Sequence, residues 1–152
     1  MSKLHFIKQG SGSPVVLSHA LGCSLHMWDE VAATLQDHFT VLRYDHRGHG
    51  LSEVISSPFD VHDMTDDALA LIQDVVGESV HFVGLSMGGM VAQDMAARHP
   101  QWVKRVVIAN SASYYDDMAK SMWDARIKNV LAGGVSSIAE GAMQRWFTPE
   151  FR

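Results

Sequence analysis

Residues 80–91 read VHFVGLSMGGMV and indicate the fold more clearly than any other segment of the chain. A β-branched apolar run leads into Gly84-Leu85-Ser86-Met87-Gly88-Gly89, and apolar residues at helical spacing follow. The pattern G-x-S-x-G between a strand and a helix is typical of a nucleophile elbow, which exposes the serine hydroxyl at the carboxyl end of a sheet. Ser86 is therefore the candidate nucleophile.

Two other interpretations of this stretch are weaker. The plain alternative is a glycine-rich turn with an incidental serine, and the flanking strand and helix favour the elbow over it. A phosphate-binding loop is excluded, because no Lys-Ser or Lys-Thr pair follows and the G-x-G-x-x-G spacing is absent.

On both sides of the elbow, strand-like and helix-like segments alternate along the chain. The short apolar runs indicate buried parallel strands, and they lie at residues 15–17, 40–44, 80–83 and 103–109. Apolar residues at helical spacing lie at residues 28–35, 68–76 and 87–96. This alternation predicts an α/β fold with a doubly wound, mostly parallel sheet. Residues 3–9 alternate apolar and polar, which favours an antiparallel edge strand.

The composition changes after Ser113. Residues 114–152 hold aromatic pairs and helical spacing without a clear strand, and they predict helices over 118–131 and 136–147, separated by Gly133-Gly134. We therefore expect a sheet core over 1–113 and a helical segment over 114–152. With nothing following to return to the sheet, the fold is expected to be truncated. The strand at 103–109 would then be an exposed apolar edge, open to self-association.

Composition and charge narrow the classes of partner. A net charge of -5 with scattered Lys and Arg argues against nucleic acid, and no apolar run is long enough to span a membrane. The stretch Met1 to Phe6 lacks the apolar segment of a signal peptide. A single cysteine, Cys23, rules out an internal disulfide framework, so a cytoplasmic location is expected by default.

The loop after the first buried strand reads Ser18-His19-Ala20-Leu21-Gly22. A backbone N–H of such a loop can approach the serine, and we expect the N–H groups of Leu21 and Met87 to form the oxyanion hole. The His19 imidazole is expected to brace the loop rather than to transfer protons.

The turn after the second buried strand is expected to be structural. Asp45 and Arg47 are placed to pair, and the neighbouring glycines allow a sharp reversal. His46 and His49 lack further ligands at metal-binding spacing, so we expect solvated loop histidines and no metal site. No cofactor is predicted.

Three motifs, in this order and spacing, resemble the α/β-hydrolase superfamily. They are His19-Ala20-Leu21-Gly22, Asp45-x-Arg47-Gly48-x-Gly50-x-Ser52 and Gly84-x-Ser86-x-Gly88-Gly89. The longer sequence segments at residues 18–28, 44–50, 84–90 and 145–152 resemble those of 3-oxoadipate enol-lactonases. The resemblance covers the whole chain but only about the first half of such an enzyme. It implies hydrolysis of an enol-lactone in the β-ketoadipate pathway of bacterial aromatic catabolism.

The order of the catalytic triad in this fold is Ser, then Asp or Glu, then His. No histidine follows His99, so we expect the chain to lack the triad base, and the acid as well. Asp116 and Asp117 are better explained as caps of the following helix. The isolated 152 residues are expected to have little or no activity, because a serine without a general base is a weak nucleophile.

In the family, the segment from about Tyr114 forms a helical cap over the serine. The resemblance implies substrate-binding roles for Trp123, Arg126 and Trp146, with Arg126 or Arg145 meeting a substrate carboxylate. Each also has a plain alternative as a core aromatic or a solvated arginine.

The sequence thus predicts a cofactor-free serine hydrolase of a small carboxylic ester or lactone. Two alternatives stay open. One is another enzyme of this fold, such as a carboxylesterase or a cofactor-free perhydrolase. The other is a non-catalytic, partner-dependent interaction module.

Overall fold

The computed structural model describes residues 3–152, so Met1 and Ser2 of the N-terminal stretch examined for a signal peptide lie outside the described residues. The chain divides into two compact units, unit 1 up to Ser113 and unit 2 from Tyr114. The boundary falls where the composition of the sequence changes.

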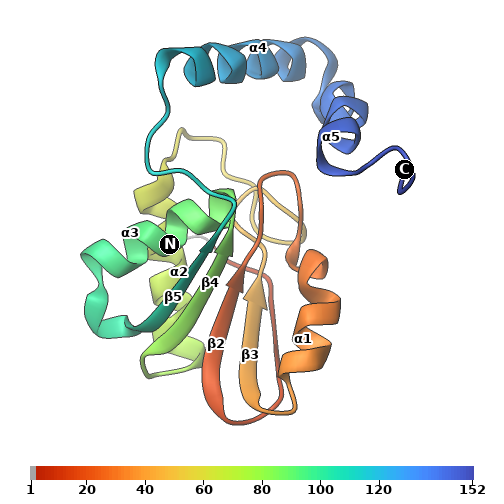
Figure 1. The fold of residues 1–152 in the computed structure, drawn as a ribbon. Coiled ribbons are helices and arrows are strands. Elements are labelled where there is room, and N and C mark those ends of the chain that lie inside the picture. Colours follow the sequence, from red (N-terminus) through yellow and green to blue (C-terminus); the bar gives the residue numbers. More distant parts are fainter. Residues whose placement is uncertain (1–2) are drawn as a thin grey trace. The chain divides into compact units, whose positions relative to one another are not determined.

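Unit 1 is built on a five-stranded sheet with the order β1-β3-β2-β4-β5 (Figure 1). The strands are β1 Phe6–Gln9, β2 Ser13–Ser18, β3 Phe39–Tyr44, β4 Val80–Leu85 and β5 Val103–Ala109. β1 pairs with β3 antiparallel, and the other three neighbouring pairs are parallel. The predicted α/β fold, its mostly parallel sheet and its antiparallel edge strand are confirmed.

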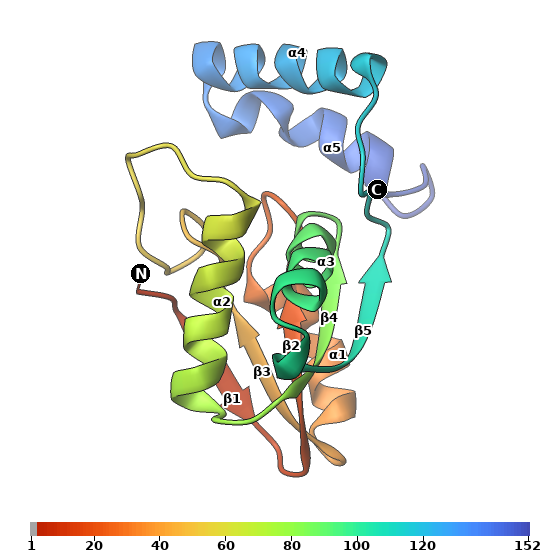
Figure 2. The same ribbon diagram turned by 90° about the vertical axis from the view of Figure 1, so that its left-hand side faces the viewer.

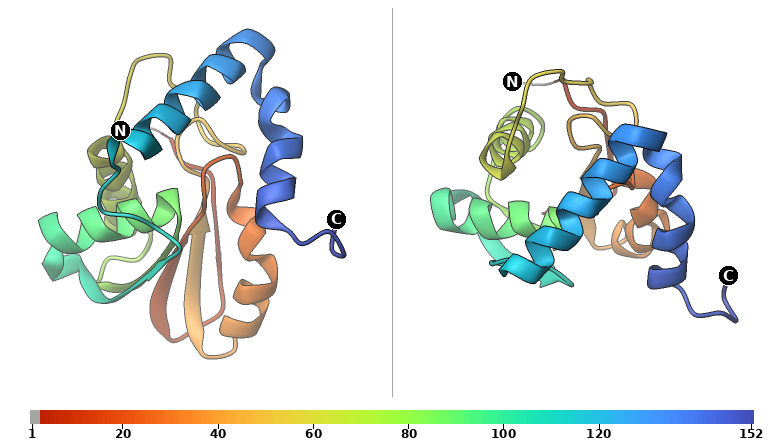
Figure 3. Two further views of the ribbon diagram at one scale, coloured as in Figure 1. Left: turned by 45° about the horizontal axis from the view of Figure 1, so that its top comes forward. Right: turned by 90° about the horizontal axis from the view of Figure 1, so that it is seen from above.

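Helices cover both faces of this sheet, with α2 and α3 on one face and α1 on the other (Figure 2). The helices and 3-10 turns of unit 1 are η1 Leu25–Trp28, α1 Asp29–Leu35, α2 Val61–Val75, α3 Met87–Arg98 and η2 Pro100–Trp102. α2 and α3 also contact each other, side by side on their face (Figure 3). The sheet is therefore doubly wound, as predicted.

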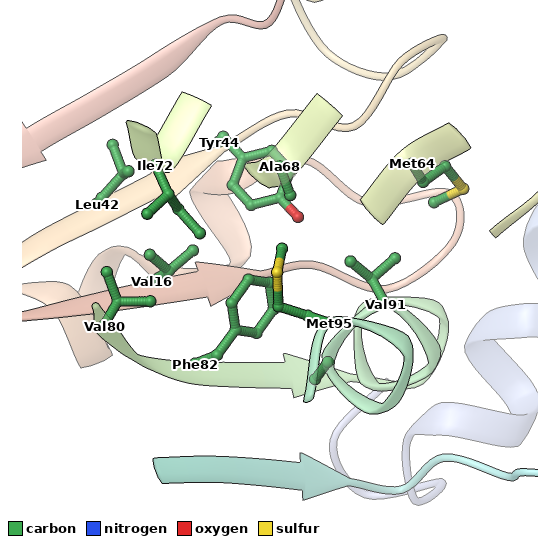
Figure 4. Packing of buried hydrophobic residues seen from close by; sticks show 11 residues of the cluster. Val16, Leu42, Tyr44, Met64, Ala68, Ile72, Val80, Phe82, Val91 and Met95 are labelled. Carbon is green, nitrogen blue, oxygen red and sulfur yellow. The ribbon is translucent and has the colours of Figure 1, made fainter. Parts of the chain in front are cut away.

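Two apolar cores follow from the alternation of side chains along the strands. On the α2 and α3 face, Val16 of β2 and Phe82 of β4 pack with Ile72 and Met95 (Figure 4). On the α1 face, the neighbouring residues Val15 and Leu17 pack with η1 and α1. Burial on both faces explains why the strands read as continuous apolar runs rather than alternating ones.

α2 begins at Val61, seven residues before the apolar pattern suggests. A capping box sets this start, because the Asp60 carboxylate accepts hydrogen bonds from the backbone N–H groups of His62 (2.8 Å) and Asp63 (3.1 Å). The Asp63 carboxylate in turn accepts from the Asp60 N–H at 2.9 Å. Aspartate at both ends of the box takes the place of the usual Ser and Glu.

Unit 2 is helical, as predicted. It comprises α4 Asp117–Gly133, η3 Val135–Ile138 and α5 Ala139–Trp146. The Asp116 carboxylate accepts a hydrogen bond from the Ala119 N–H at 2.8 Å, so this residue caps α4 as expected. Gly134 ends α4 with φ 73°, in the left-handed region. α5 starts later than predicted, because the preceding residues form a 3-10 turn.

β5 lies at the edge of the sheet and is paired with β4 within residues 3–152. Its apolar side chains Val106, Val107 and Ile108 are 38%, 53% and 45% exposed. Within the described residues, β5 is therefore an edge strand with exposed apolar side chains.

α3 approaches the sheet so closely that backbone meets backbone. A Cβ added to Gly88 would overlap the carbonyl group of Ser18 at the end of β2. A Cβ added to Gly84 would overlap the carbonyl group of Gly88 itself. The two glycines of the G-x-S-x-G pattern therefore fix how near the helix can come to β2 and β4.

We expect Gly88→Ala to lower the free energy of unfolding by about 1–3 kcal/mol, because the added methyl overpacks a backbone contact. Gly141→Ala is the matched control, since a Cβ at this helical position meets nothing within 4 Å. The control should be neutral or raise stability by up to about 1 kcal/mol through helix propensity. Urea unfolding followed by circular dichroism measures both, and equal midpoints for the two variants would contradict the close-approach argument.

Candidate active site

Ser86 sits at the junction of β4 and α3 with φ 53° and ψ −114°. A residue with a side chain pays about 1–3 kcal/mol to occupy such a sparsely populated region, so surrounding contacts must hold it there. The Ser86 N–H donates to the carbonyl oxygen of Ala109 at 3.0 Å. The Ser86 carbonyl accepts from the Ser111 hydroxyl at 2.8 Å and from the Met90 N–H at 3.1 Å.

The Ser86 side chain is not used to cap α3. Serine is a favoured N-cap residue, yet within residues 3–152 its hydroxyl makes no capping hydrogen bond. Met87 is the first residue of α3, where backbone N–H groups lack intrahelical acceptors. Ser86 is partly exposed and stands at the positive end of a helix dipole, which stabilises a developing anion.

The loop that carries Leu21 leaves the same edge of the sheet as the elbow. β2 and β4 are parallel neighbours, with Ser18 in register with Gly84. The Cys23 N–H donates to the Ala20 carbonyl at 3.1 Å, which closes a turn with Leu21 and Gly22 at its centre. Gly22 has φ 78°, as the third position of a type II turn requires.

A buried carboxylate joins this loop to the turn after β3. Asp45 accepts hydrogen bonds from the N–H groups of Leu25 (2.7 Å) and Leu51 (3.0 Å). The expected pair between Asp45 and Arg47 is wrong, because Arg47 reaches α2 instead and donates to the Asp67 carboxylate at 2.7 Å. The two charges of the motif thus fasten different parts of the turn.

His19 is fully buried and braces the loop, as the sequence predicts. Its Nδ1 lies 2.8 Å from the Ala20 carbonyl oxygen, and its Nε2 accepts from the His46 N–H at 3.0 Å. The expectation that His46 is solvated is wrong. Its ring is buried and its Nε2 lies 2.9 Å from the Ser18 hydroxyl, which contacts the Tyr44 hydroxyl at 3.1 Å.

Burial sets the protonation of these rings. It lowers the pKa of His19 and lowers the pKa of His46 well below the ordinary imidazole value. Both rings are therefore neutral at neutral pH and act as bracing groups. Within residues 3–152, no three His, Cys, Asp or Glu side chains are grouped to hold a metal ion.

Two of the three substrate-binding candidates in unit 2 come together. Trp123 and Arg126 line a pocket of about 160 Å³ with Ala119, Met122 and Arg145. The Arg126 guanidinium carbon lies 4.3 Å from the centre of the Trp123 ring. Trp146 does not line this pocket, and its side chain is 51% exposed.

Arg126 is unusual for an arginine on a helix surface. Burial, together with the neighbouring positive charge of Arg145, lowers its pKa. Its Nε atom is buried and has no hydrogen-bond partner among the described residues. A buried guanidinium N–H without an acceptor is costly, which sets Arg126 apart from a solvated arginine.

Comparison with known proteins matches residues 13–134 to the family model of the alpha/beta hydrolase fold. The chain belongs to the α/β-hydrolase family. A 3-oxoadipate enol-lactonase of Acinetobacter baylyi is 34% identical over 143 residues, which make up 94% of this chain and 53% of that protein. This α/β-hydrolase chain spans about half the length of the curated relatives it matches.

Two solved structures are similar to this α/β-hydrolase chain. The enol-lactonase of Burkholderia xenovorans superposes with a TM-score of 0.92 at 35% identity, over 99% of this chain and 58% of that one. A thermophilic esterase of Thermogutta terrifontis, with malate bound, superposes with a TM-score of 0.88 at 29% identity, over 95% of this chain and 54% of that one.

Among the helices of residues 3–152, none has the length and apolar character needed to cross a membrane.

We expect the stability of this α/β-hydrolase chain to fall below about pH 6.5. The unfolded chain takes up protons at the ordinary imidazole pKa, whereas folded His19 and His46 take them up only at lower pH. Each histidine therefore removes up to about 1.4 kcal/mol per pH unit in this range. Urea unfolding at pH 7.5, 6.5 and 5.5 measures the slope.

His46→Gln should flatten this slope even if it lowers stability at pH 7.5. His38→Gln, at an exposed position, is the matched control and should keep the slope of the parent. An unchanged slope in His46→Gln would rule out this histidine as a source of the acid sensitivity.

Proposed function

We propose that this chain supplies the nucleophile half of a serine hydrolase that cleaves a small carboxylic ester or lactone of the enol-lactone type. The observation that carries the proposal is the backbone of Ser86, held at φ 53° between β4 and α3 with its hydroxyl left out of helix capping. Strain of this kind persists where it serves function. The enol-lactonase and esterase names of the similar proteins support the choice of reaction.

In the proposed reaction, the Ser86 oxygen attacks the carbonyl carbon of the substrate while its proton passes to the base. The ester or lactone C–O bond then breaks, the leaving oxygen takes up that proton, and an acyl-enzyme remains. The N–H groups of Leu21 and Met87 stabilise the oxyanion, each contributing roughly 3 kcal/mol to lowering the barrier. Water then releases the acyl group. A serine needs a base, and an acid to orient it. We assign both to the part of such enzymes that lies outside the matched half.

Labelling with a fluorophosphonate tests the nucleophile in the natural gene product. We expect one adduct on Ser86 by intact-mass and peptide mass spectrometry. Ser86→Ala should abolish the adduct and lower kcat/KM for an enol-lactone by at least about 10³-fold, because the nucleophile is lost. Ser136→Ala, an exposed serine of unit 2, is the control and should label normally. Labelling that persists in Ser86→Ala would refute the assignment.

We further propose that the substrate carries a carboxylate that binds in the pocket of Trp123 and Arg126. Among residues 3–152 the buried Arg126 Nε has no acceptor, and the second guanidinium of Arg145 lies nearby. Planar guanidinium groups suit carboxylates. The malate bound to the similar esterase is itself a dicarboxylate, which supports this class of ligand.

Arg126→Met should raise KM for a carboxylate-bearing enol-lactone about 10- to 100-fold in the full-length protein, since a hydrogen bond to a charged group contributes roughly 1.5–3 kcal/mol. Hydrolysis of a neutral aryl acetate should change less than about twofold, because that substrate has no carboxylate to lose. Lys128→Met, at an exposed position of α4, is the control. Equal losses on both substrates would show that Arg126 acts through structure rather than recognition.

A second candidate function is a partner-dependent interaction module that pairs through β5. The exposed apolar side chains of this edge strand favour it, because an unpaired edge is a template for another strand. Size-exclusion chromatography of the natural gene product, together with the labelling experiment, separates the candidates. Self-association without an adduct on Ser86 favours the module.

Among the enzymes of this fold, a second comparison distinguishes a lactonase, an esterase and a perhydrolase. It measures the rates of enol-lactone hydrolysis, aryl acetate hydrolysis and peroxide-dependent halogenation.

A further inference from the structure

The loop after β2 and the turn after β3 are joined by two histidine side chains, one from each segment. From the loop, His19 reaches across so that its Nε2 accepts from the His46 N–H of the turn at 3.0 Å. From the turn, His49 reaches back so that its Nε2 accepts from the Gly22 N–H of the loop at 3.2 Å. Their ring centres lie 5.2 Å apart. Each segment is therefore fastened to the other through an imidazole and a backbone N–H.

The other nitrogen of each ring fixes its tautomer. The Nδ1 of His49 lies 3.1 Å from the Arg47 carbonyl oxygen, and the Nδ1 of His19 lies 2.8 Å from that of Ala20. A carbonyl oxygen only accepts, so each Nδ1 carries the proton and each Nε2 keeps its lone pair. Both rings must be neutral for both contacts to exist, because an imidazolium has no acceptor.

The His49 contact falls on the peptide next to the one that carries the proposed oxyanion donor. The Leu21 N–H belongs to the Ala20–Leu21 peptide, whose carbonyl oxygen lies 2.8 Å from His19 Nδ1. The Gly22 N–H belongs to the peptide unit joining Leu21 to Gly22, directly after the proposed oxyanion donor. Gly22 is exposed and has φ 78°, and a Cβ added to it would meet none of the described residues within 4 Å. The hydrogen bond from the Cys23 N–H to the Ala20 carbonyl closes the turn internally. The orientation of the turn relative to the rest of unit 1 therefore depends on its contacts with other segments.

We propose that His49 is a positioning residue whose Nε2 holds the peptide between Leu21 and Gly22, and so restricts rotation at Leu21, whose own N–H is the proposed oxyanion donor. This inference rests on the proposed function of Ser86. Asp45 fastens the loop further along, at Leu25, and His19 holds the Ala20 carbonyl, so loss of His49 leaves the loop attached but frees the Leu21–Gly22 peptide. Removing a whole oxyanion donor costs roughly 10²–10³ in rate, and a misaimed donor costs part of that.

The test uses the full-length natural gene product and two substitutions at one position. His49→Phe keeps a ring but removes the acceptor, and should lower both kcat and the rate of Ser86 phosphonylation about tenfold with KM within twofold. His49→Gln offers an amide oxygen as acceptor for Gly22 and should recover most of the loss. His26→Phe is the control, because that exposed histidine contacts Asp29 and not the loop.

The outcomes separate this inference from the proposed function. If Ser86 of the parent protein is not labelled, the proposed function fails. If Ser86 is labelled at the same rate in all His49 variants, the proposed function stands and the positioning role is wrong. A similar loss in His49→Phe and His49→Gln also overturns the role, because the acceptor would then not matter.

A measurement on the unsubstituted protein keeps the inference testable if His49→Phe fails to fold. Long-range ¹H–¹⁵N correlation spectra at neutral pH should show His49 protonated at Nδ1 with a bare Nε2. The amide of Gly22 should show a scalar coupling to that nitrogen. A ring protonated at Nε2, or an imidazolium, would overturn the proposal.

Discussion

The reversal of the chain between β4 and α3 requires backbone to contact backbone at two places. Gly84 lies against the carbonyl of Gly88, and Gly88 lies against that of Ser18. Any side chain there would push α3 away from β2 and β4. The close packing leaves Ser86 no ordinary conformation. A hydrogen bond from its N–H to the Ala109 carbonyl and one from the Ser111 hydroxyl to its own carbonyl hold it at φ 53°. Apolar packing of α3 by Met95 and its neighbours supplies the free energy that offsets this strain.

The parts that were predictable from the sequence are those set by local patterns. Continuous apolar runs mark strands buried on both faces, and G-x-S-x-G marks a reversal where side chains do not fit. Helix ends were predictable where one residue decides them, as with the Asp116 cap and Gly134. The start of α2 could have been found from the two aspartates at 60 and 63, which form a capping box in an unusual composition.

The parts that were not predictable depend on contacts between distant segments. His46 looks like a loop histidine in sequence, and only the packing of β2 against β3 shows that its ring is buried beside Ser18. Asp45 and Arg47 look like a pair because they are close in sequence. The carboxylate accepts hydrogen bonds from backbone N–H groups, and the guanidinium reaches the buried Asp67 of α2. A buried polar group is hydrogen-bonded to the partners that the fold brings beside it, and the periodicity of the sequence does not reveal which residues these are.

The boundary after Ser113 has a consequence for how such proteins diversify. The residues that hold the serine, namely Gly84, Gly88, Ala109 and Ser111, all lie before that boundary. A recombination event at the junction would exchange the helical segment of one relative for that of another and leave those contacts whole. Chimaeras joined between Ser113 and Tyr114 are therefore a natural starting point for redirecting such a scaffold to new esters.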